Sequence, residues 1–393
     1  MTVLEQAKAL GPYMASIRET IHAYPELGNE EHQTAGVIAR ELNRLGIGYQ
    51  TGVANTGVVG LLKGEKEGEE KTILLRADID ALPIQEQNDL PFASQNAGKM
   101  HACGHDVHTA MLLGAAEILA SRKDLFSGNV KFCFQPAEEA PEGGAELMVK
   151  EGVLENPKVD FAMGLHVNPT FPIGQCAVTE GPVTACPDFF TIEFLGKGGH
   201  GSLPHLAKDP IAPLAQFVTQ LPQVRTKINA QHPCVIQLCS FHGGTAPAVI
   251  PDCCKGEGTV RVFQKEDSFQ VEAELKQLAE AIAQAYGVTC RFHYRRRCFS
   301  VVNDPAFAAR VRQSTADIFE QGFREHRDMG GDDFCFFSDK VPSIYMPIGS
   351  YDGTEKTAYP LHHPQFNIGY GVLEKGAAAL AQCALDFLSG VWQ

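Results

Sequence analysis

Residues 100–110 read M-H-A-C-G-H-D-V-H-T-A, and the apolar run 111–120 that follows has the composition of a buried helix. Cys103 and His105 are two positions apart, so in an extended segment their side chains lie on the same face, where a thiolate and a neutral imidazole can share one metal ion. Three further ligating residues crowd the same span, namely His101, Asp106 and His108. A single buried Cys or His is usually a packing residue, but five ligating groups within eight residues indicate a metal site.

Three apolar runs elsewhere in the chain end in polar residues. Residues 72–75 lead into R-A-D-I-D, residues 129–134 into Q-P-A-E-E, and residues 159–164 into L-H-V. Such runs indicate buried strands, whose carboxyl ends build sites in open α/β sheets. Each predicted strand therefore delivers a residue that can bind a metal ion or transfer a proton. Because helical patterns alternate with these strands, we predict an α/β fold with a parallel or mixed sheet covered by helices on both faces.

The character of the chain changes near residues 181–182. Beyond them, residues 188–294 follow the order strand, helix, two strands, helix, strand, which is a complete unit of ferredoxin type. The ends of such a unit lie close together, which indicates an insertion into a first domain. A chain of 393 residues also exceeds one ordinary core. We therefore predict a catalytic domain formed by residues 1–183 and 297–393, with an inserted domain at 184–296.

The composition indicates which partners the protein is expected to bind and in which cellular compartment we expect it. The formal net charge is −14, from 33 Lys and Arg against 47 Asp and Glu, and this disfavours binding to nucleic acid or to an anionic membrane. No apolar stretch is long enough to span a bilayer, and residues 1–18 do not resemble a signal or transit peptide. The twelve cysteines are scattered and do not form a disulfide framework. We expect a cytoplasmic protein that acts on a small molecule, and an anionic substrate would need local positive charge.

A set of five candidate ligands can be collected along the chain. A mixture of thiolate, imidazole and carboxylate suits one or two divalent transition ions, zinc or manganese first and cobalt or nickel next, and does not suit a calcium or magnesium cage. The candidates are Cys103, His105, Glu139, His166 and His362.

Glu138 is predicted to transfer protons and not to bind the metal, because it directly precedes the candidate ligand Glu139. If Glu139 binds the metal, Glu138 is within reach of the water on that metal and can remove its proton. Glu138 can then pass the proton to a leaving amine as a general acid. The pattern therefore predicts a metal-assisted hydrolase.

Nine short segments resemble the metal-dependent amidohydrolases that include hippurate hydrolase, N-acyl-L-amino-acid amidohydrolase, N-acetyldiaminopimelate deacetylase and the indoleacetyl-amino-acid hydrolases. They occur in order along nearly the whole chain. They are RADIDALPIQE (76–86), HACGHDVHTA (101–110), FQPAEE (134–139), GLHV (164–167), KGGHG (197–201), PH (204–205), IPD (250–252), GTVR (258–261) and LHHP (361–364).

The resemblance implies a dinuclear metal site in a two-domain fold, held by the five candidate ligands, with Glu138 as the general acid and base. It implies hydrolysis of an N-acyl amino acid to a carboxylic acid and a free amino acid. The inserted domain is expected to act as a lid and to mediate a homodimer. By similarity, His200 reaches a catalytic site, that of the partner subunit, and donates to the developing oxyanion. Arg261 binds the substrate carboxylate, and His205 also contacts the substrate.

Two departures and several alternatives accompany this resemblance. Asp332 stands where Glu is common, which gives a shorter reach with the same charge. Relatives usually have Asn where this chain has Ala248, and that amide helps to hold the substrate, so the specificity can differ here. The acyl group is not fixed, and a deacetylase of the N-acetyldiaminopimelate type is the nearest alternative. A cysteine hydrolase with Cys103 as nucleophile is a second. A non-catalytic metal-binding or ligand-binding relative is a third, and the presence of Glu138 argues against it.

Overall fold

The computed structural model describes residues 1–392, which divide into two compact units. The first unit consists of Met1–Gly181, Val301–His326 and the chain from Asp333 onward. The second consists of Pro182–Ser300 and Arg327–Asp332. Each unit has a hydrophobic core of its own.

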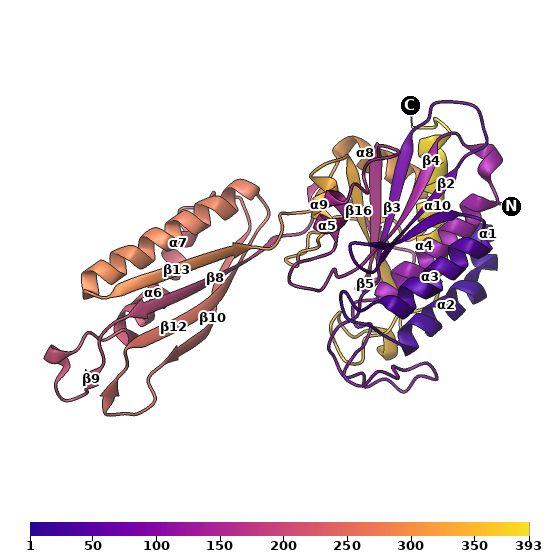
Figure 1. The fold of residues 1–393 in the computed structure, drawn as a ribbon. Coiled ribbons are helices and arrows are strands. Elements are labelled where there is room, and N and C mark those ends of the chain that lie inside the picture. Colours follow the sequence, from indigo (N-terminus) through magenta and orange to yellow (C-terminus); the bar gives the residue numbers. More distant parts are fainter. Residues whose placement is uncertain (393) are drawn as a thin grey trace. The chain divides into compact units, whose positions relative to one another are not determined.

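The first unit is organised around an eight-stranded mixed sheet in the order β1-β2-β4-β3-β5-β16-β6-β15 (Figure 1). Its central pairs β4-β3, β3-β5 and β5-β16 are parallel, whereas β1-β2 and β2-β4 are antiparallel. The predicted mixed α/β sheet is therefore confirmed. The strands are β1 (Gly48–Val53), β2 (Gly57–Lys63), β3 (Thr72–Asp78), β4 (Asn129–Gln135), β5 (Phe161–Pro172), β6 (Cys176–Ala177), β15 (Phe323–Arg324) and β16 (Ser343–Tyr351).

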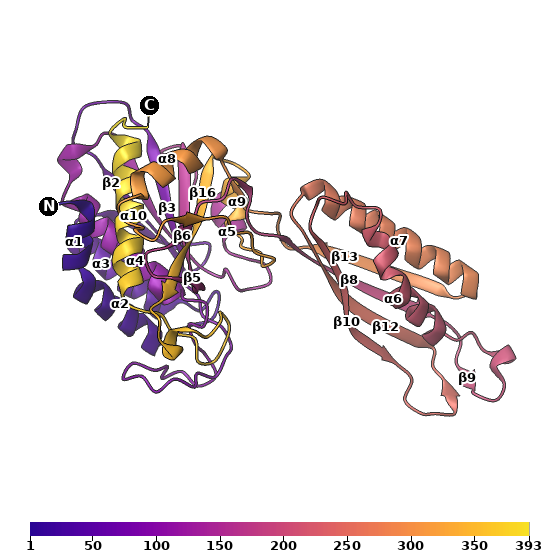
Figure 2. The same cartoon turned by 180° about the vertical axis from the view of Figure 1, so that it is seen from behind.

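Both faces of this sheet are covered, as the alternation along β4 shows. Phe132 and Phe134 belong to the same hydrophobic core as residues of α4 and α10. Figure 2 shows these two helices beside the strands of the sheet. Cys133 points to the other face, where its Sγ lies 3.7 Å from Met148 Sδ of α5. The helices of this unit are α1 (Val3–Ala9), α2 (Gly11–Ala23), α3 (His32–Arg44), α4 (His105–Ala120), α5 (Ala145–Lys150), α8 (Pro305–Thr315), α9 (Cys335–Ser338) and α10 (Gly371–Leu388), with short 3-10 turns η1 (Lys123–Leu125) and η3 (Glu355–Thr357).

Strand β5 differs from its prediction in length. The sequence places the strand at residues 159–164 with His166 beyond its end, but β5 continues to Pro172. It continues because β16 offers a parallel partner along its length, pairing Pro347 with His166 and Ile348 with Val167. His166 is thus held within the sheet.

The second unit is a four-stranded antiparallel sheet in the order β10-β12-β8-β13. This is the predicted ferredoxin-type arrangement, with β8 and β12 in the centre. Phe190, Ile192 and Phe194 of β8 pack with α6 and α7 on one face, and the other face is partly exposed. The elements of this unit are β8 (Cys186–Leu195), β9 (Gly199–His200), η2 (Pro204–Leu206), α6 (Ile211–Arg225), β10 (Cys234–Gly243), β11 (Val249–Ile250), β12 (Cys253–Val262), α7 (Lys265–Tyr286) and β13 (Thr289–Arg296). The short strand β14 (Val302–Asn303) belongs to the first unit, and β7 (Gly181–Pro182) lies where the chain passes from one unit to the other.

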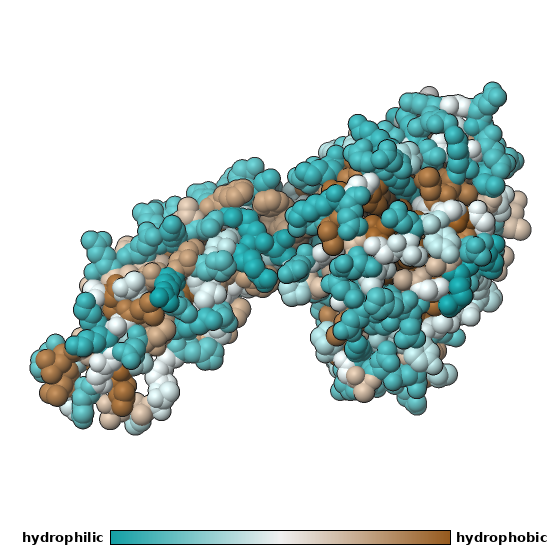
Figure 3. All heavy atoms as spheres, viewed as in Figure 1, coloured by the Kyte–Doolittle hydropathy of each residue, from teal (hydrophilic) through white to brown (hydrophobic). Residues whose placement is uncertain are grey.

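Figure 3 shows hydrophilic residues over most of the visible face of each unit. Among residues 1–392, no helix combines the length and the apolar character needed to cross a membrane.

Candidate metal centre

The turn that precedes α4 fixes the positions of Cys103 and His105. Gly104 between them has φ 87°, in the left-handed region that glycine adopts without a steric penalty. A Cβ atom at this position would lie 2.6 Å from Val167 Cγ2, so the backbone is also tightly packed against β5. Cys103 lies in the irregular segment before this turn, and His105 is the first residue of α4. Both side chains are buried.

The five predicted ligands lie together in the first unit. Ligand atoms of Cys103, His105 and Glu139 all lie within 4.8 Å of one another. His166 adjoins this group, with Nε2 3.5 Å from Cys103 Sγ. His362 adjoins it on another side, with Nε2 3.1 Å from Glu139 Oε1. The structure therefore gathers donors from four separate segments of the chain.

Two atoms of this cluster are buried without a hydrogen-bond partner among the described residues. They are His105 Nε2 and Glu139 Oε1. His362 lies close to Glu139 Oε1 but without hydrogen-bond geometry, and His105 Nε2 is 3.6 Å from Asp78 Oδ2. Buried polar atoms that lack partners are costly unless something else satisfies them. The donor set of thiolate, imidazole and carboxylate is one that binds divalent transition ions, so the residues fit such a metal.

Asp80 joins the predicted ligands to the loop that carries Glu138. Its Oδ1 accepts the Glu138 backbone N–H at 3.0 Å and its Oδ2 accepts the Glu139 N–H at 2.9 Å. Asp80 Oδ1 also lies 3.2 Å from His105 Nδ1. The loop enters this arrangement through Ala137, whose φ of 55° is unusual for a residue with a side chain. The sequence places Asp80 at a strand end, but nothing in its pattern predicts that it holds both glutamates.

His108 is near the cluster and has its ring nitrogens engaged elsewhere. The backbone N–H of Val167 donates to His108 Nε2 at 3.0 Å. The proton of His108 is therefore on Nδ1, which lies 2.5 Å from Asp78 Oδ1 and donates to it. Asp78, His105, His108 and His166 are close enough for a metal site of their own. Because Nε2 of His108 accepts from the backbone, we interpret this second group as a hydrogen-bonded support for β5.

The electrostatics of the cluster depend on its burial. Burial, together with the charge of Glu139, raises the pKa of the Cys103 thiol well above its usual range. Burial would lower the pKa of His105, but Asp78 and Asp80 outweigh it and hold that pKa well above normal. Burial would raise the pKa of Glu139, but His362 and His105 lower it to about 2. A thiolate at Cys103 therefore requires a strong positive charge beside it, which a metal ion would supply.

A buried polar network links the start of α4 to α2. Asp106 Oδ2 accepts from Arg18 Nε at 3.2 Å and lies 2.8 Å from His22 Nδ1. His22 Nε2 lies 3.1 Å from Glu86 Oε1. Neighbouring His101 is also buried, and burial lowers its pKa to about 3, so it is neutral. Sequence reasoning missed Arg18, His22 and Glu86, because a charged residue on a helical pattern has no local feature that identifies a distant buried partner.

The other predicted site residues lie in the second unit. His200 is exposed at the end of β9, and the Gly201 N–H next to it donates to Ala248 O at 2.8 Å. His205 is exposed in η2. Arg261 is near the far end of β12, which starts at Cys253, only three residues beyond β11 and its partner β9. Eight residues of strand span about 26 Å, so His200 and Arg261 lie at opposite ends of this unit's sheet.

The fold and the donor cluster together define a class of protein: an α/β metalloenzyme with an inserted α+β unit, built to bind a catalytic divalent ion. The chain belongs to peptidase family M20/M25/M40, whose family model matches residues 74–386. This confirms the family that the nine sequence motifs indicate.

Relatives from several organisms are similar over nearly the full chain. Thermostable carboxypeptidase 1 of Saccharolobus solfataricus is 37% identical, with 95% of each chain covered. N-acetylcysteine deacetylase of Bacillus subtilis is also 37% identical, covering 98% of this chain and 99% of the relative. A solved Bacillus subtilis structure, described as a dinuclear metal-binding peptidase from the M20 family, is 36% identical with a TM-score of 0.84 and covers 97% of this chain and 99% of its own.

Proposed function

We propose that the protein hydrolyses the amide bond of an N-acyl amino acid and releases a carboxylic acid and a free amino acid. The observation that carries this proposal is the cluster of Cys103, His105 and Glu139, with Glu138 next to Glu139 in the chain and close enough for its charge to act on the Cys103 thiol. The carboxypeptidase and the N-acetylcysteine deacetylase among the relatives support it, because both names describe cleavage of an amide whose nitrogen belongs to an amino acid with a free carboxylate.

The proposed metal ligands are the five donors that the structure gathers. One or two divalent transition ions, zinc or manganese first, would be held by Cys103, His105, Glu139, His166 and His362. When bound, such an ion lowers the pKa of water and polarises the acyl carbonyl. The positive φ of 64° at His362 supports a functional role for this residue, because strained backbone persists mainly where a site requires it.

Glu138 is the proposed general base and acid. Its backbone is fixed by the hydrogen bond to Asp80, and its side chain is buried in the same loop that presents Glu139. Glu138 takes a proton from the attacking water and gives it to the leaving amine, so that the amine departs uncharged. A cysteine hydrolase is disfavoured, because Cys103 is buried among metal-competent donors and its raised pKa opposes a free thiolate.

We also propose that two subunits cooperate in one reaction. His200 and Arg261 lie at opposite ends of one sheet, about 26 Å apart along the strand direction, so one small substrate cannot touch both residues of the same subunit. If both act on the substrate, they come from different subunits. The exposed β10 edge, with Val235 and Phe241 exposed, and the exposed Leu203 and Leu206 beside His205 support a homodimer through this unit.

The cytoplasmic location remains a prediction. It is supported by the twelve cysteines, which are all free in the structure, and by a proposed thiolate ligand that needs a reducing environment.

Metal-stripped protein tests the reaction class. Turnover of N-acetyl, N-benzoyl and indoleacetyl amino acids should be absent without metal and return when zinc or manganese is added. Two neighbouring variants then separate the roles in the loop. Glu138→Gln should keep its metal and lose turnover by several orders of magnitude, whereas Glu139→Gln should bind less metal.

The same preparation distinguishes the alternatives. An enzyme that uses Cys103 as nucleophile would keep its activity in a chelator and lose it on alkylation. A non-catalytic relative would bind metal and cleave no substrate of the panel. Undiminished turnover in Glu138→Gln would refute the proposed role of Glu138.

A further inference from the structure

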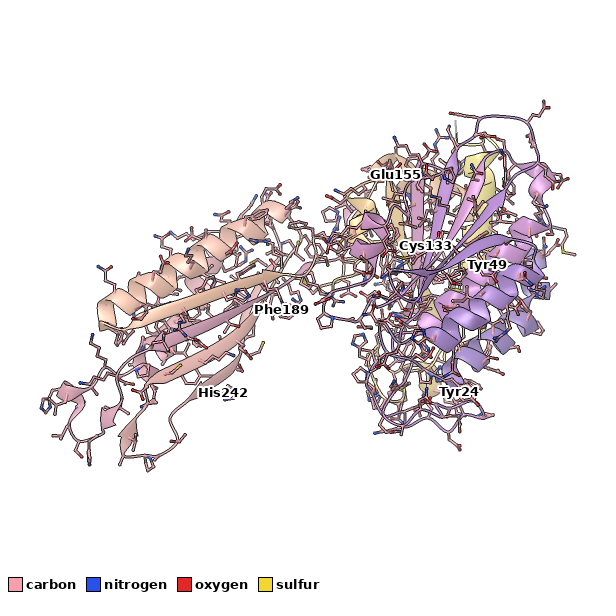
Figure 4. All side chains as sticks on the ribbon, viewed as in Figure 1. Tyr24, Tyr49, Cys133, Glu155, Phe189 and His242 are labelled. Carbon is pink, nitrogen blue, oxygen red and sulfur yellow. The ribbon has the colours of Figure 1, made fainter. Side chains whose placement is uncertain are left out.

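The partly exposed face of the second unit's sheet carries an aromatic ring between two arginines. Phe189 of β8, labelled in Figure 4, has the Arg261 guanidinium 5.2 Å from its ring centroid and the Arg295 guanidinium at the same distance. Arg261 comes from β12 and Arg295 from β13, the two strands that flank β8. Both contacts are cation–π interactions, which are favourable and hold the planar groups against the ring.

Neither arginine has an ion-pair partner among the described residues. Arg261 Nη1 donates only to the carbonyl oxygens of Asp188 and Val260, at 3.4 and 3.2 Å. The Asp188 carboxylate is used on the helix-covered side, where Ser268 Oγ donates to it at 2.5 Å and Tyr294 OH at 2.8 Å. The arginines therefore keep guanidinium edges available for an anion.

The rest of the same face is neutralised pair by pair. Lys255 Nζ lies 2.7 Å from Glu257, and Arg291 Nη1 lies 3.8 Å from Glu193. Two guanidinium groups without an ion pair beside one ring are therefore a local exception on this face, in a protein whose net charge is −14, although the Asp188 carboxylate acts on Arg261 electrostatically. Such local positive charge is what an anionic ligand requires.

The spacing specifies the kind of anion. Neighbouring strands lie about 4.8 Å apart, so β12 and β13, with β8 between them, are separated by about 10 Å. With the Phe189 ring between the two guanidinium groups, a single carboxylate cannot pair with both. A small molecule with two carboxylates several bonds apart can pair with each, and guanidinium groups bind carboxylates with high geometric specificity.

We infer that Arg261, Phe189 and Arg295 form a clamp for a substrate that carries two carboxylates, and that Arg295 selects N-acyl derivatives of dicarboxylic amino acids. The inference rests on the proposed function, in which Arg261 receives the α-carboxylate of the substrate. Arg295 then receives the second carboxylate, on the amino-acid side chain. A dicarboxylic acyl group would present the same chemistry, and the substrates of the test separate the two sources.

Isosteric substrate pairs test the selectivity. The wild type should cleave N-acetylglutamate with a kcat/KM roughly tenfold to hundredfold above that for N-acetylglutamine, the range expected for one charge-assisted hydrogen-bonded pair. Arg295→Gln should lower kcat/KM for N-acetylglutamate roughly tenfold to hundredfold and so remove this preference. Arg291→Gln is the matched control, on the same strand and face, and should keep the preference. A wild-type preference for N-succinylalanine over N-butyrylalanine that Arg295→Gln removes would support the clamp and assign the second carboxylate to the acyl group.

A binding measurement that needs no turnover distinguishes failure of the clamp from failure of the proposed function. In calorimetric titrations, glutarate should bind more tightly than butyrate, and Arg295→Gln should abolish the difference while Arg291→Gln keeps it. If no N-acyl amino acid is cleaved, the proposed function fails, and the glutarate titration still decides whether the clamp exists. Equal binding of glutarate and butyrate, or a preference that survives Arg295→Gln, overturns the clamp.

Discussion

The carboxylate of Asp80 accepts the backbone N–H of Glu138 at 3.0 Å, although the two residues are 58 positions apart in the chain. The same carboxylate also accepts the N–H of Glu139 and contacts His105 Nδ1. One side chain at the end of β3 therefore positions the proposed base and two proposed ligands at once. Outer groups of this kind orient the residues that bind a metal and tune their basicity.

Replacing Asp80 should disturb the site more than the fold. In Asp80→Asn the amide can no longer accept from both backbone N–H groups and His105 together, so we expect metal affinity or kcat to fall by roughly tenfold to hundredfold. Metal titration and steady-state kinetics check this. Asp89→Asn, which changes an exposed carboxylate nine residues further along the chain, is the control and should behave like the wild type. Equal activity of the two variants would contradict the role given to Asp80.

His105 and His108 should respond differently to substitution. In His108→Leu the Val167 N–H and Asp78 Oδ1 lose their partner, and each unsatisfied buried group costs about 1 to 3 kcal/mol of stability. The variant should unfold at a lower temperature and still bind the wild-type number of metal ions. His105→Leu should lose bound metal. Metal analysis of protein that circular dichroism shows to be folded makes the comparison, and equal metal loss in both variants would make His108 a ligand.

Gly104→Ala should be destabilising for two separable reasons. The left-handed φ of 87° penalises any side chain by about 1 kcal/mol or more, and the added Cβ would lie 2.6 Å from Val167 Cγ2. Gly98→Ala isolates the first effect, because Gly98 has φ 75° and nothing within 4 Å of the added atom. Denaturant unfolding should therefore show a larger loss for Gly104→Ala, and only this variant should bind metal more weakly.

Lys131 should make the stability of the protein depend on pH in the alkaline range. Its ammonium group donates to Val153 O at 2.8 Å and to Glu155 O at 2.5 Å, and burial lowers its pKa from 10.5 to about 8. Between these values the unfolded chain holds a proton that the folded chain has released, so the free energy of unfolding should rise with pH from about 8 to 10.5. Lys131→Met should remove this rise. Urea unfolding at several pH values measures it, and an unchanged slope in the variant would contradict the assignment.

Much of the fold could be predicted, because each element is indicated by the residue pattern of its own segment. Apolar runs at residues 72–75 and 129–134 predict buried strands wherever they fall in space, and β3 and β4 begin at the predicted residues 72 and 129. The order of elements in the second unit follows from periodicity in the same way. The length of β5 could not be predicted, since residues 165–172 are strand only because β16 pairs beside them.

The candidate site also has features that the sequence predicts and features that it does not. The density of ligating groups around Cys103 and the adjacent Glu138 and Glu139 can be seen in the sequence, and the structure places Cys103, His105 and Glu139 together. The contacts of Asp80, and those of Arg18 and His22 with Asp106, join segments tens of residues apart. Nothing local to either partner specifies such a pair. The functional roles of the site residues remain predictions that the variants above test.

The continuation of β5 through His166 gives the proposed metal ligands two different kinds of backbone support. His166 is anchored in the middle of the sheet, whereas Glu139 and His362 lie on loops entered through residues with left-handed backbone. Opening motions of a protein concentrate in such loops and spare central strands. Of the proposed ligands, His166 would therefore keep its position without a metal ion, whereas Glu139 and His362 would depend more on their loops for theirs.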